Sequence, residues 1–198
     1  MGDPVIAAVL LACAANIAPV TLEAVIQVES RGDPLLLHVN GLGAVQPRHP
    51  ADAKEAVQLA RSYIAQGYSV DLGLMQVNNR NLAALGYTVE QVLDDPCTNI
   101  RAGAAVLSAD YAAAVRTHGD GQPALQAALS AYNTGDFYRG FANGYVARYY
   151  RPGGIPALTE VPAVAAAAVK HEAPQPWPNP YTADTTVYVR EAMDVEIR

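Results

Sequence analysis

Apolar residues recur at helical spacing along residues 5–150, and this periodicity predicts a mainly α-helical protein. The clearest helix covers residues 22–30. Its inward stripe holds three apolar residues and one acid: Leu22, Val25, Ile26 and Glu29. We expect this helix to begin at Thr21, whose hydroxyl can cap the first turn, and to end before Gly32. A carboxyl group therefore stands where a core residue is expected.

Further helices are predicted from the same spacing and from the residues that begin and end them. They are expected at residues 5–15, 52–66, 78–85, 98–118, 123–135 and 144–150, with a short helix after a capping box at residues 88–91. Residues 98–118 form the longest and are rich in alanine, which predicts a central helix that its neighbours approach closely. Residues 32–50 and 71–78 carry glycine, proline or polar amides, so we interpret both segments as irregular loops.

The composition of the chain changes at Arg151. Beyond it, seven prolines punctuate a stretch rich in Ala and Val: Pro152, Pro156, Pro162, Pro174, Pro176, Pro178 and Pro180. Such a stretch is typical of an extended linker or tail. We therefore predict a helical domain at residues 1–150 and a Pro/Ala-rich C-terminal tail at residues 151–198, with one strand at residues 185–189.

The overall composition excludes several classes of protein. The 198 residues are 51% apolar and 16% charged, which predicts a packed domain rather than disorder. The net charge is −6 without any basic cluster, so no nucleic-acid partner is expected. No stretch has the length of a membrane span. Residues 5–12 resemble the middle of a signal peptide, but no Lys or Arg precedes them, so we interpret them as the first core helix.

The two cysteines, Cys13 and Cys97, lie far apart in the sequence. A disulfide between them would close a long loop, stabilise the fold by about 4 kcal/mol in the chain-entropy model, and require an oxidising compartment. Two buried free thiols are the alternative. We expect the disulfide.

Glu29 is the leading candidate for a catalytic group. Desolvation at the end of the apolar stripe would raise the pKa of its carboxyl group, and general-acid catalysis needs an acid that is protonated at neutral pH. The alternative is a helix-end carboxylate that points into solvent. Other polar residues also stand at helix ends or in loops beside apolar positions: Ser30, Gln76, Asn78, Tyr132, Asn133 and Tyr145.

If these residues converge, they form a cleft with one acid and a ring of amides and hydroxyls. The set lacks the His and carboxylate cluster of a metal site, and no Ser or Cys has an assignable base. Eleven tyrosines suit a wet sugar-binding groove, although an amphipathic helix surface would carry them too. One acid beside sugar-type hydrogen-bonding groups indicates cleavage of a glycosidic bond.

Two further residues have open roles. His38 is the histidine nearest to Glu29 in the sequence, and it is either a catalytic partner or a solvated loop residue. Asp71 precedes a glycine turn, and it is either a second acid at the site, which would permit hydrolysis, or a cap for backbone groups.

Three short motifs follow one another along the chain: residues 29–30 (Glu-Ser), 73–76 (Gly-Leu-Met-Gln) and 131–135 (Ala-Tyr-Asn-Thr-Gly). In this order they resemble the motifs of lytic transglycosylases with a goose-lysozyme-like (SLT) catalytic domain. Residues 29–34, 73–78 and 95–100 look more narrowly like the VirB1-type members, which accompany type IV secretion systems. The resemblance covers about residues 5–150 and leaves the tail without a motif.

The resemblance implies a lysozyme-like helical fold with irregular loops, a periplasmic location, and peptidoglycan glycan strands as the substrate. Glu29 would first protonate the leaving oxygen of the β-1,4 bond between N-acetylmuramic acid and N-acetylglucosamine. As a carboxylate it would then take the proton from the muramyl 6-hydroxyl, which closes on C1 and leaves a 1,6-anhydro end. This would open the cell wall for a type IV secretion system, whose components the tail could recruit.

The resemblance also implies a set of substrate-binding residues around Glu29. Tyr145 would form a hydrogen bond with Glu29, Met75 would form the floor of the groove, and the other members would line it: Gln76, Tyr132, Asn133, Ser30 and Gly73. No cofactor or metal is expected, and the muramyl hydroxyl makes a second carboxylate unnecessary. Two alternatives stay open, a peptidoglycan hydrolase (muramidase) on the same fold and a non-catalytic peptidoglycan-binding scaffold.

Overall fold

The computed structural model describes residues 4–150 of the chain. The predicted tail at residues 151–198, with its strand at residues 185–189, lies outside the described residues, so the division into a domain and a tail stays a prediction. Within the described part the protein is mainly helical, as predicted, and it also contains a small sheet.

Helices form most of the described chain, and short strands lie between them. In chain order the elements are α1 (Pro4–Cys13), α2 (Pro19–Glu29), β1 (Leu37–Val39), α3 (Ala53–Ala65), β2 (Val70–Leu72), β3 (Val77–Asn78), α4 (Asn79–Leu85), α5 (Val89–Asp94), α6 (Pro96–His118), α7 (Gln122–Thr134), α8 (Arg139–Ala142) and the 3₁₀ helix η1 (Val146–Tyr149). The order of the long helices is the one that the apolar spacing predicts.

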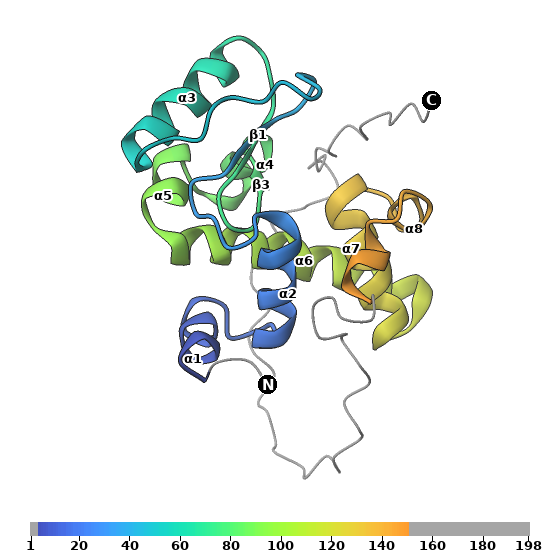
Figure 1. Ribbon diagram of the computed structural model, residues 1–198. Coiled ribbons are helices and arrows are strands. Elements are labelled where there is room, and N and C mark those ends of the chain that lie inside the picture. Colours follow the sequence, from blue (N-terminus) through green and yellow to red (C-terminus); the bar gives the residue numbers. More distant parts are fainter. Residues whose placement is uncertain (1–3, 151–198) are drawn as a thin grey trace.

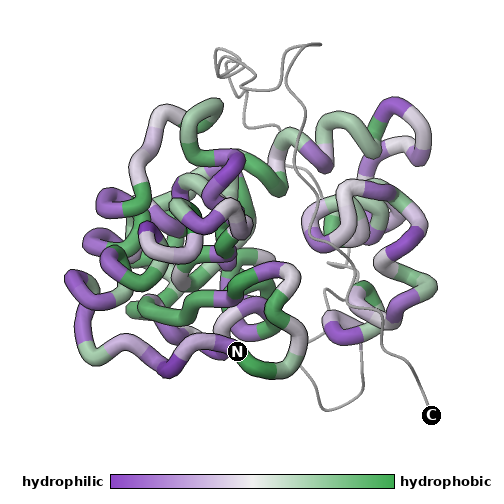
Figure 2. The backbone as a smooth tube through the Cα atoms, turned by 90° about the horizontal axis from the view of Figure 1, so that it is seen from above, coloured by the Kyte–Doolittle hydropathy of each residue, from purple (hydrophilic) through white to green (hydrophobic). Residues whose placement is uncertain are grey.

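Two groups of elements stand on either side of α2 (Figure 1). One group holds the sheet with α3, α4 and α5, and the other holds α7 and α8. α6 runs beneath both groups and packs against α1, α4, α5 and α7, so the predicted central helix joins the two halves. Figure 2 shows the same arrangement from above, with many of the apolar positions gathered inside the half that contains the sheet.

The predictions of irregular loops at residues 32–50 and 71–78 were partly wrong, because β1 lies in the first segment and the second supplies parts of β2 and β3 on either side of a turn. β2 lies between β1 and β3. Its middle residue, Asp71, has His38 of β1 and Asn78 of β3 as its neighbours across the sheet. The strands are two or three residues long, and β2 and β3 are buried at every residue. Such strands carry no alternation of polar and apolar residues that a sequence could reveal.

Two predicted helix starts were also wrong. α2 begins at Pro19, and Thr21 is a buried residue within the first turn rather than the N-cap. Proline is tolerated at the start of a helix because the N–H that it lacks has no partner there. α6 likewise begins at Pro96 rather than Thr98, and the carboxylate of Asp95 accepts hydrogen bonds from the N–H groups of its first turn.

Most predicted helix ends are confirmed. Asp52 caps α3, and Thr88 and Gln91 form the capping box of α5. Gly86 and Gly135 are the C-caps of α4 and α7, and both adopt the left-handed conformation. The last expected helix is the 3₁₀ helix η1, and α8 before it was not predicted because four residues are too few to show periodicity.

The main core gathers the inward faces of α2 and α6, the sheet and η1. The predicted stripe of α2 lies in it, with Leu22 and Val25 fully buried. Cys13, at the end of α1, and Cys97, in the first turn of α6, form a disulfide as expected. Over residues 4–150, the structure contains no helix that combines the length and the apolar character needed to cross a membrane.

Candidate active site

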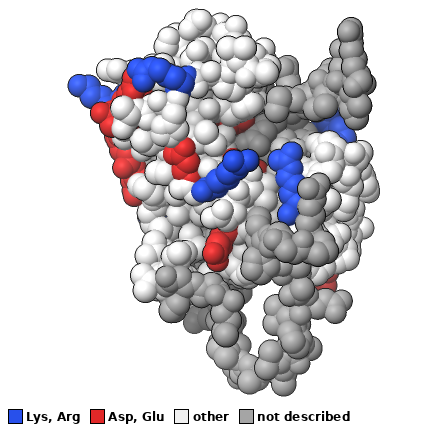
Figure 3. Space-filling model, viewed as in Figure 1, with Lys and Arg blue, Asp and Glu red and all other residues white. Residues whose placement is uncertain are grey.

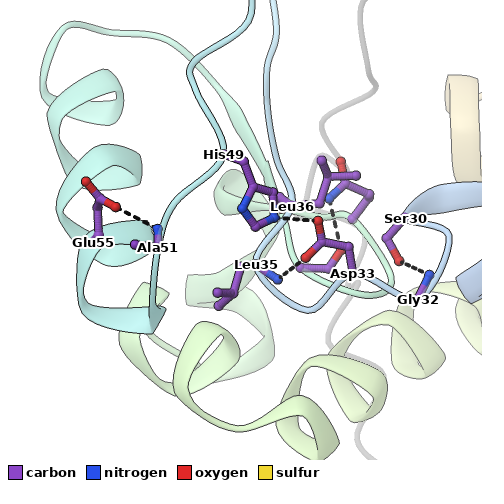
Figure 4. Close-up of polar contacts among 10 residues, drawn as sticks. Ser30, Gly32, Asp33, Leu35, Leu36, His49, Ala51 and Glu55 are labelled. Carbon is purple, nitrogen blue, oxygen red and sulfur yellow. Dashed lines mark hydrogen bonds and ion pairs between the residues drawn. The ribbon is translucent and has the colours of Figure 1, made fainter.

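Glu29 is the last residue of α2 and is half-buried. Ser30 is the C-cap of the helix, and its hydroxyl donates to the carbonyl of Ile26 at 3.1 Å and accepts from the N–H of Gly32 at 3.2 Å. Figure 4 shows the second of these contacts. Arg31 and Gly32 then adopt positive φ angles of 58° and 84°. The chain thus turns away immediately behind the carboxyl group, which stays partly open to solvent.

One aspartate holds the loop that follows α2. Asp33 Oδ1 accepts from the N–H of Leu35 at 2.9 Å, and its Oδ2 lies 2.7 Å from His49 Nε2. Figure 4 shows Asp33 pointing toward both partners, with His49 approaching from the chain that precedes α3. These contacts join the beginning and the end of residues 32–50, a segment that contains β1 and that the sequence indicated only as irregular.

A tight turn joins β2 to β3 and is built around Asn99 of α6. Asn99 is fully buried, and its amide accepts from the N–H of Met75 and donates to the carbonyl of Leu72, both at 2.8 Å. Gly73 has a φ of 66°, and a Cβ at this position would lie 2.5 Å from the Asn99 amide nitrogen, so the turn requires glycine. Gln76 also has a positive φ, 48°, which is uncommon for a residue with a side chain.

The same turn positions Gln76 and Tyr132. Gln76 Nε2 donates to the carbonyls of Leu36 and Gly73 at 3.0 and 2.9 Å. The Tyr132 hydroxyl donates to the carbonyl of Met75 at 2.7 Å and so ties α7 to the turn. Two motifs that are distant in the sequence therefore meet at one place in the fold.

Tyr145 reaches Glu29 from the last described segment of the chain. Its hydroxyl donates a hydrogen bond to Glu29 Oε1 and lies 2.7 Å from the hydroxyl of Tyr149. Burial, together with the nearby Glu29 carboxylate and Tyr149, holds the pKa of Tyr145 well above its ordinary value of 10.0. The phenol therefore keeps its proton at neutral pH and remains a donor to Glu29. The guanidinium of Arg148 lies over the Tyr145 ring, 5.6 Å from its centroid.

A cleft of about 430 Å³ opens beside Glu29. Glu29 is the single carboxylate among the described residues that line it, whereas two histidines and two arginines also line it: His38, His49, Arg48 and Arg148. The cleft is therefore less acidic than the whole chain, whose net charge is −6. On the face shown in Figure 3, both basic and acidic side chains lie near the middle of the molecule.

The predicted site residues fall into two groups. Four of them line the cleft: Glu29, Gln76, Asn133 and Tyr145. The other four do not line it: Ser30, Gly73, Met75 and Tyr132. Met75 is fully buried beneath the turn, and Tyr132 lines a smaller cavity together with Gln76. Contact between each of these eight residues and a substrate stays a prediction.

Asp71 is fully buried in β2 and does not line the cleft. Its Oδ2 accepts from Asn40 Nδ2 at 3.2 Å, and its Oδ1 accepts from Asn78 Nδ2 at 2.8 Å. Asp71 instead lines the smaller cavity, of about 20 Å³, which Asp110 of α6 also lines. Asp110 Oδ2 is buried without a hydrogen-bond partner, and burial raises the pKa of Asp110 to about 7. Asp71 is thus separated from the cleft that contains Glu29.

His38, the other residue with an open role, lines the cleft from β1 and faces Asp71 across the sheet. Within residues 4–150 the His, Cys, Asp and Glu side chains form no group of three or more that could hold a metal ion. The chemistry that these residues offer in the cleft therefore comes from one carboxyl group, amides, phenols and basic side chains.

Sequence reasoning missed three residues that position the site. Asn99 holds the turn from within a helix, and although it lies in the family-like segment at residues 95–100, no periodic pattern indicates this role. Asn143 accepts from the N–H of Tyr145 at 2.9 Å and donates to Asn133 Oδ1 at 3.3 Å, although it looks like an ordinary turn residue. Tyr149 follows Tyr145 by four residues, a spacing that places two side chains on one helical face and could have indicated the pair.

Comparison with known proteins gives matches over most of the described chain. The family described as "Transglycosylase SLT domain" matches residues 10–149. Protein virB1 of Agrobacterium fabrum (strain C58) is 46% identical over 134 residues, which are 68% of this chain and 53% of that protein. Protein virB1 of Rhizobium radiobacter is 42% identical over 162 residues, which are 81% of this chain and 66% of that protein.

A relative from another genus gives a similar result. The type IV secretion system protein virB1 of Brucella abortus biovar 1 (strain 9-941) is 41% identical over 130 residues, which are 65% of this chain and 53% of that protein. The chain thus spans between about half and two thirds of the length of these curated relatives. No solved structure matches the chain significantly.

Proposed function

This chain belongs to the transglycosylase SLT domain family, and from that premise we propose that it is a peptidoglycan lytic transglycosylase with Glu29 as both acid and base. The bond cut is the β-1,4 bond between N-acetylmuramic acid and N-acetylglucosamine, with a 1,6-anhydro end as the product. One observation carries the proposal. Among the described residues, the cleft is lined by a single carboxyl group, and the buried phenol of Tyr145 donates a hydrogen bond to it.

A single carboxyl group favours the anhydro route over ordinary hydrolysis. Glycoside hydrolysis generally uses two carboxyl groups, one as the acid and one that activates water or attacks the sugar. Asp71 was the candidate for the second group, but it is fully buried, it is hydrogen-bonded to two asparagine amides, and it does not line the cleft. A hydroxyl of the substrate itself can attack without a second carboxylate, because it is already held next to the reacting carbon.

The proposed reaction has two proton transfers through Glu29. The protonated acid gives its proton to the glycosidic oxygen while the bond from that oxygen to C1 breaks, and N-acetylglucosamine leaves with a free hydroxyl. The Glu29 carboxylate then takes the proton of the muramyl 6-hydroxyl as O6 forms its bond to C1. Glu29 ends protonated, as it began, and no water is consumed.

The other residues of the cleft suit this substrate. Gln76 and Asn133 bring amide groups to the lining, which can bind the hydroxyl and N-acetyl groups of the sugars. Arg148 adds positive charge, which attracts the carboxylates of peptidoglycan peptides. Tyr145 keeps its hydroxyl directed at Glu29 Oε1.

The relatives suggest a cellular role for this activity. Since proteins named virB1 are similar over most of this chain, and one is named as a type IV secretion system protein, we place its activity in opening the cell wall for such a system. The disulfide between Cys13 and Cys97 is consistent with an extracytoplasmic location such as the periplasm. Recruitment of secretion components by residues 151–198 is part of the same proposal.

The test is digestion of purified peptidoglycan, with mass spectrometry of the products. The wild type should release anhydro-muropeptides, which are one water lighter than hydrolysed ones. Glu29→Gln removes the transferable proton at nearly constant size and should lower the rate by about a thousandfold. Glu23→Gln, on the same helix and outside the cleft lining, is the matched control and should keep full activity.

Two results would replace this proposal by one of its alternatives. Hydrated muropeptides from the wild type would identify a hydrolase on the same fold. If the wild type binds peptidoglycan without cutting it, and Glu29→Gln still supports secretion in cells, the protein is a non-catalytic scaffold.

A further inference from the structure

Two tyrosine hydroxyls extend the hydrogen-bond network of the Glu29 carboxyl group into the core. The Tyr145 hydroxyl contacts Glu29 Oε1, and the Tyr149 hydroxyl lies 2.7 Å from that of Tyr145. Both rings belong to the core, with Tyr145 2% exposed and Tyr149 fully buried. They pack edge to face, with centroids 5.5 Å apart. The motif resemblance assigns roles to Glu29 and Tyr145, and it assigns none to Tyr149.

The directions of the two hydrogen bonds follow from counting protons. A phenol has one O–H, so it can donate only one hydrogen bond of this kind, although it can also accept. Tyr145 donates its proton to Glu29 Oε1. The contact of 2.7 Å between the phenols is therefore a hydrogen bond that Tyr149 donates and Tyr145 accepts. The two hydrogen bonds therefore point in one direction, from Tyr149 to Tyr145 and from Tyr145 to Glu29.

This direction decides which oxygen of Glu29 can carry the acid proton. A proton on Oε1 would have to point at the oxygen of Tyr145, and Tyr145 would then have to donate to Tyr149. Both phenols would need to reverse the direction of their hydrogen bonds together, and such a concerted rearrangement of a buried network costs free energy. The proton is therefore held on Oε2.

We infer that Tyr149 is a positioning residue for the reaction: by donating to Tyr145, it keeps Tyr145 a donor to Glu29 Oε1 and leaves Oε2 as the oxygen that gives and takes the proton. The inference rests on the proposed function of Glu29. Tyr149 acts only through Tyr145. In a chain of buried hydrogen bonds each bond polarises the next, so Tyr149 also strengthens the bond from Tyr145 to Glu29.

Other charged and titratable groups also face Glu29. They come from β1, from the loop before α3 and from η1: His38, Arg48, His49 and Arg148. Arg48 pairs with Glu55, and His49 pairs with Asp33. These groups contribute to the pH dependence of any activity in the cleft. They are the same in every variant below, so a difference between variants reports the two tyrosines.

The experiment is the pH–rate profile of peptidoglycan cleavage by Tyr149→Phe. Loss of one hydroxyl weakens the hydrogen bond to the Glu29 carboxylate, so Glu29 keeps its proton to higher pH. We expect the alkaline limb to move up by about 0.5 pH unit. We also expect kcat at neutral pH to fall about three- to tenfold, because the proton is no longer confined to Oε2, with KM nearly unchanged.

The matched control is Tyr150→Phe. Tyr150 is the next residue, and it also loses one hydroxyl, which donates to Gln122 Oε1 at 3.1 Å and does not contact Glu29 or Tyr145. Its pH profile should equal that of the wild type. In a Tyr145→Phe background, Tyr149→Phe should cause no further shift of the profile, because the residue through which it acts has lost its hydroxyl.

A milder change covers the case in which Tyr149→Phe fails to fold. Placing 3-fluorotyrosine only at position 149 keeps the ring and the hydroxyl but makes the hydroxyl a stronger donor, so the alkaline limb should move to lower pH. Identical profiles for the position-149 variants and Tyr150→Phe would overturn the inference while leaving Glu29 in its proposed role. Full activity of Glu29→Gln would instead overturn the proposed function itself.

Discussion

At the scale of single residues, the site depends on buried polar side chains whose atoms have partners. Asn99 uses its amide to hold the turn before Gln76, and Asp71 accepts from two asparagine amides. Asp110 is different, because its Oδ2 is buried and has no hydrogen-bond partner. A carboxyl group in this position favours its neutral form, since ionisation inside the protein is costly.

The burial of the Asp110 carboxyl group predicts that the stability of the protein depends on pH. Burial raises its pKa from 3.8 to about 7 in the folded protein. Below about pH 4 both the folded and the unfolded chain hold the proton. As the pH rises from there to about pH 7, the unfolded chain ionises first, so stability is lost, by an amount on the order of 4 kcal/mol.

Asp110→Asn should remove this loss. Its melting temperature should exceed that of the wild type at pH 8 by clearly more than at pH 4, as measured by thermal unfolding followed by circular dichroism. Asp120→Asn, at an exposed position in the turn before α7, is the control and should give a constant difference. A difference for Asp110→Asn that does not change between pH 4 and pH 8 would contradict the argument.

At the scale of elements, the site depends on how closely α6 approaches the turn between β2 and β3. Gly103 of α6 lies directly beneath Met75, and a Cβ on Gly103 would come within 2.4 Å of the Met75 Cβ. A second close contact joins α7 and α8, where the Ser130 hydroxyl accepts from the N–H of Gly140 at 2.8 Å. The small residues let backbone pack on backbone, and this brings the turn to its position beside the cleft.

Gly103→Ala should destabilise the protein although it favours the helix. Alanine gains about 1 kcal/mol over glycine in a helix interior, but here the added methyl group has no space and should cost about 1–3 kcal/mol net. Urea unfolding measures the change. Ala112→Gly, on the exposed face of α6, should lower the free energy of unfolding by about 1 kcal/mol. This variant measures the difference in helix propensity between alanine and glycine without a packing change. A Gly103→Ala variant more stable than the wild type would exclude the close contact.

At the scale of the whole molecule, α1 is held by its packing and by one covalent bond. It packs against α2 and α6, and the disulfide joins Cys13 to Cys97 across 84 positions of the sequence. The segment between them contains α2 with Glu29, the sheet, and α3 to α5. The disulfide therefore closes a loop that contains the acid and the turn on which the proposed chemistry depends.

Removal of the disulfide should lower stability substantially. For a loop of this length the chain-entropy model gives about 4 kcal/mol, so Cys13→Ala/Cys97→Ala should unfold at a clearly lower urea concentration than the oxidised wild type. Reductant should lower the midpoint of the wild type and leave that of the double variant unchanged. Two titratable thiols in the oxidised protein would show that the bond does not form in solution.

Local patterns in the sequence determined the long helices, most of their caps and the candidate acid. Helical spacing depends on neighbours three and four residues away, so the stripe that ends in Glu29 is visible without a structure. The pairing of two distant cysteines was expected because they are the only two. The positions of polar residues at helix ends indicated most of the other candidates, and the resemblance to a family supplied their expected roles, Gly73 and Met75, and the expected lysozyme-like fold.

Only the tertiary structure decided which of these residues share a cleft. The strands of the sheet are too short to leave a pattern, and they separate Asp71 from the cleft by burying it between amides. Tyr145 meets Glu29 across 116 positions of the sequence, and Tyr149 joins them only because η1 packs in the core. Contacts of this kind depend on how whole elements pack, and no local pattern records that packing.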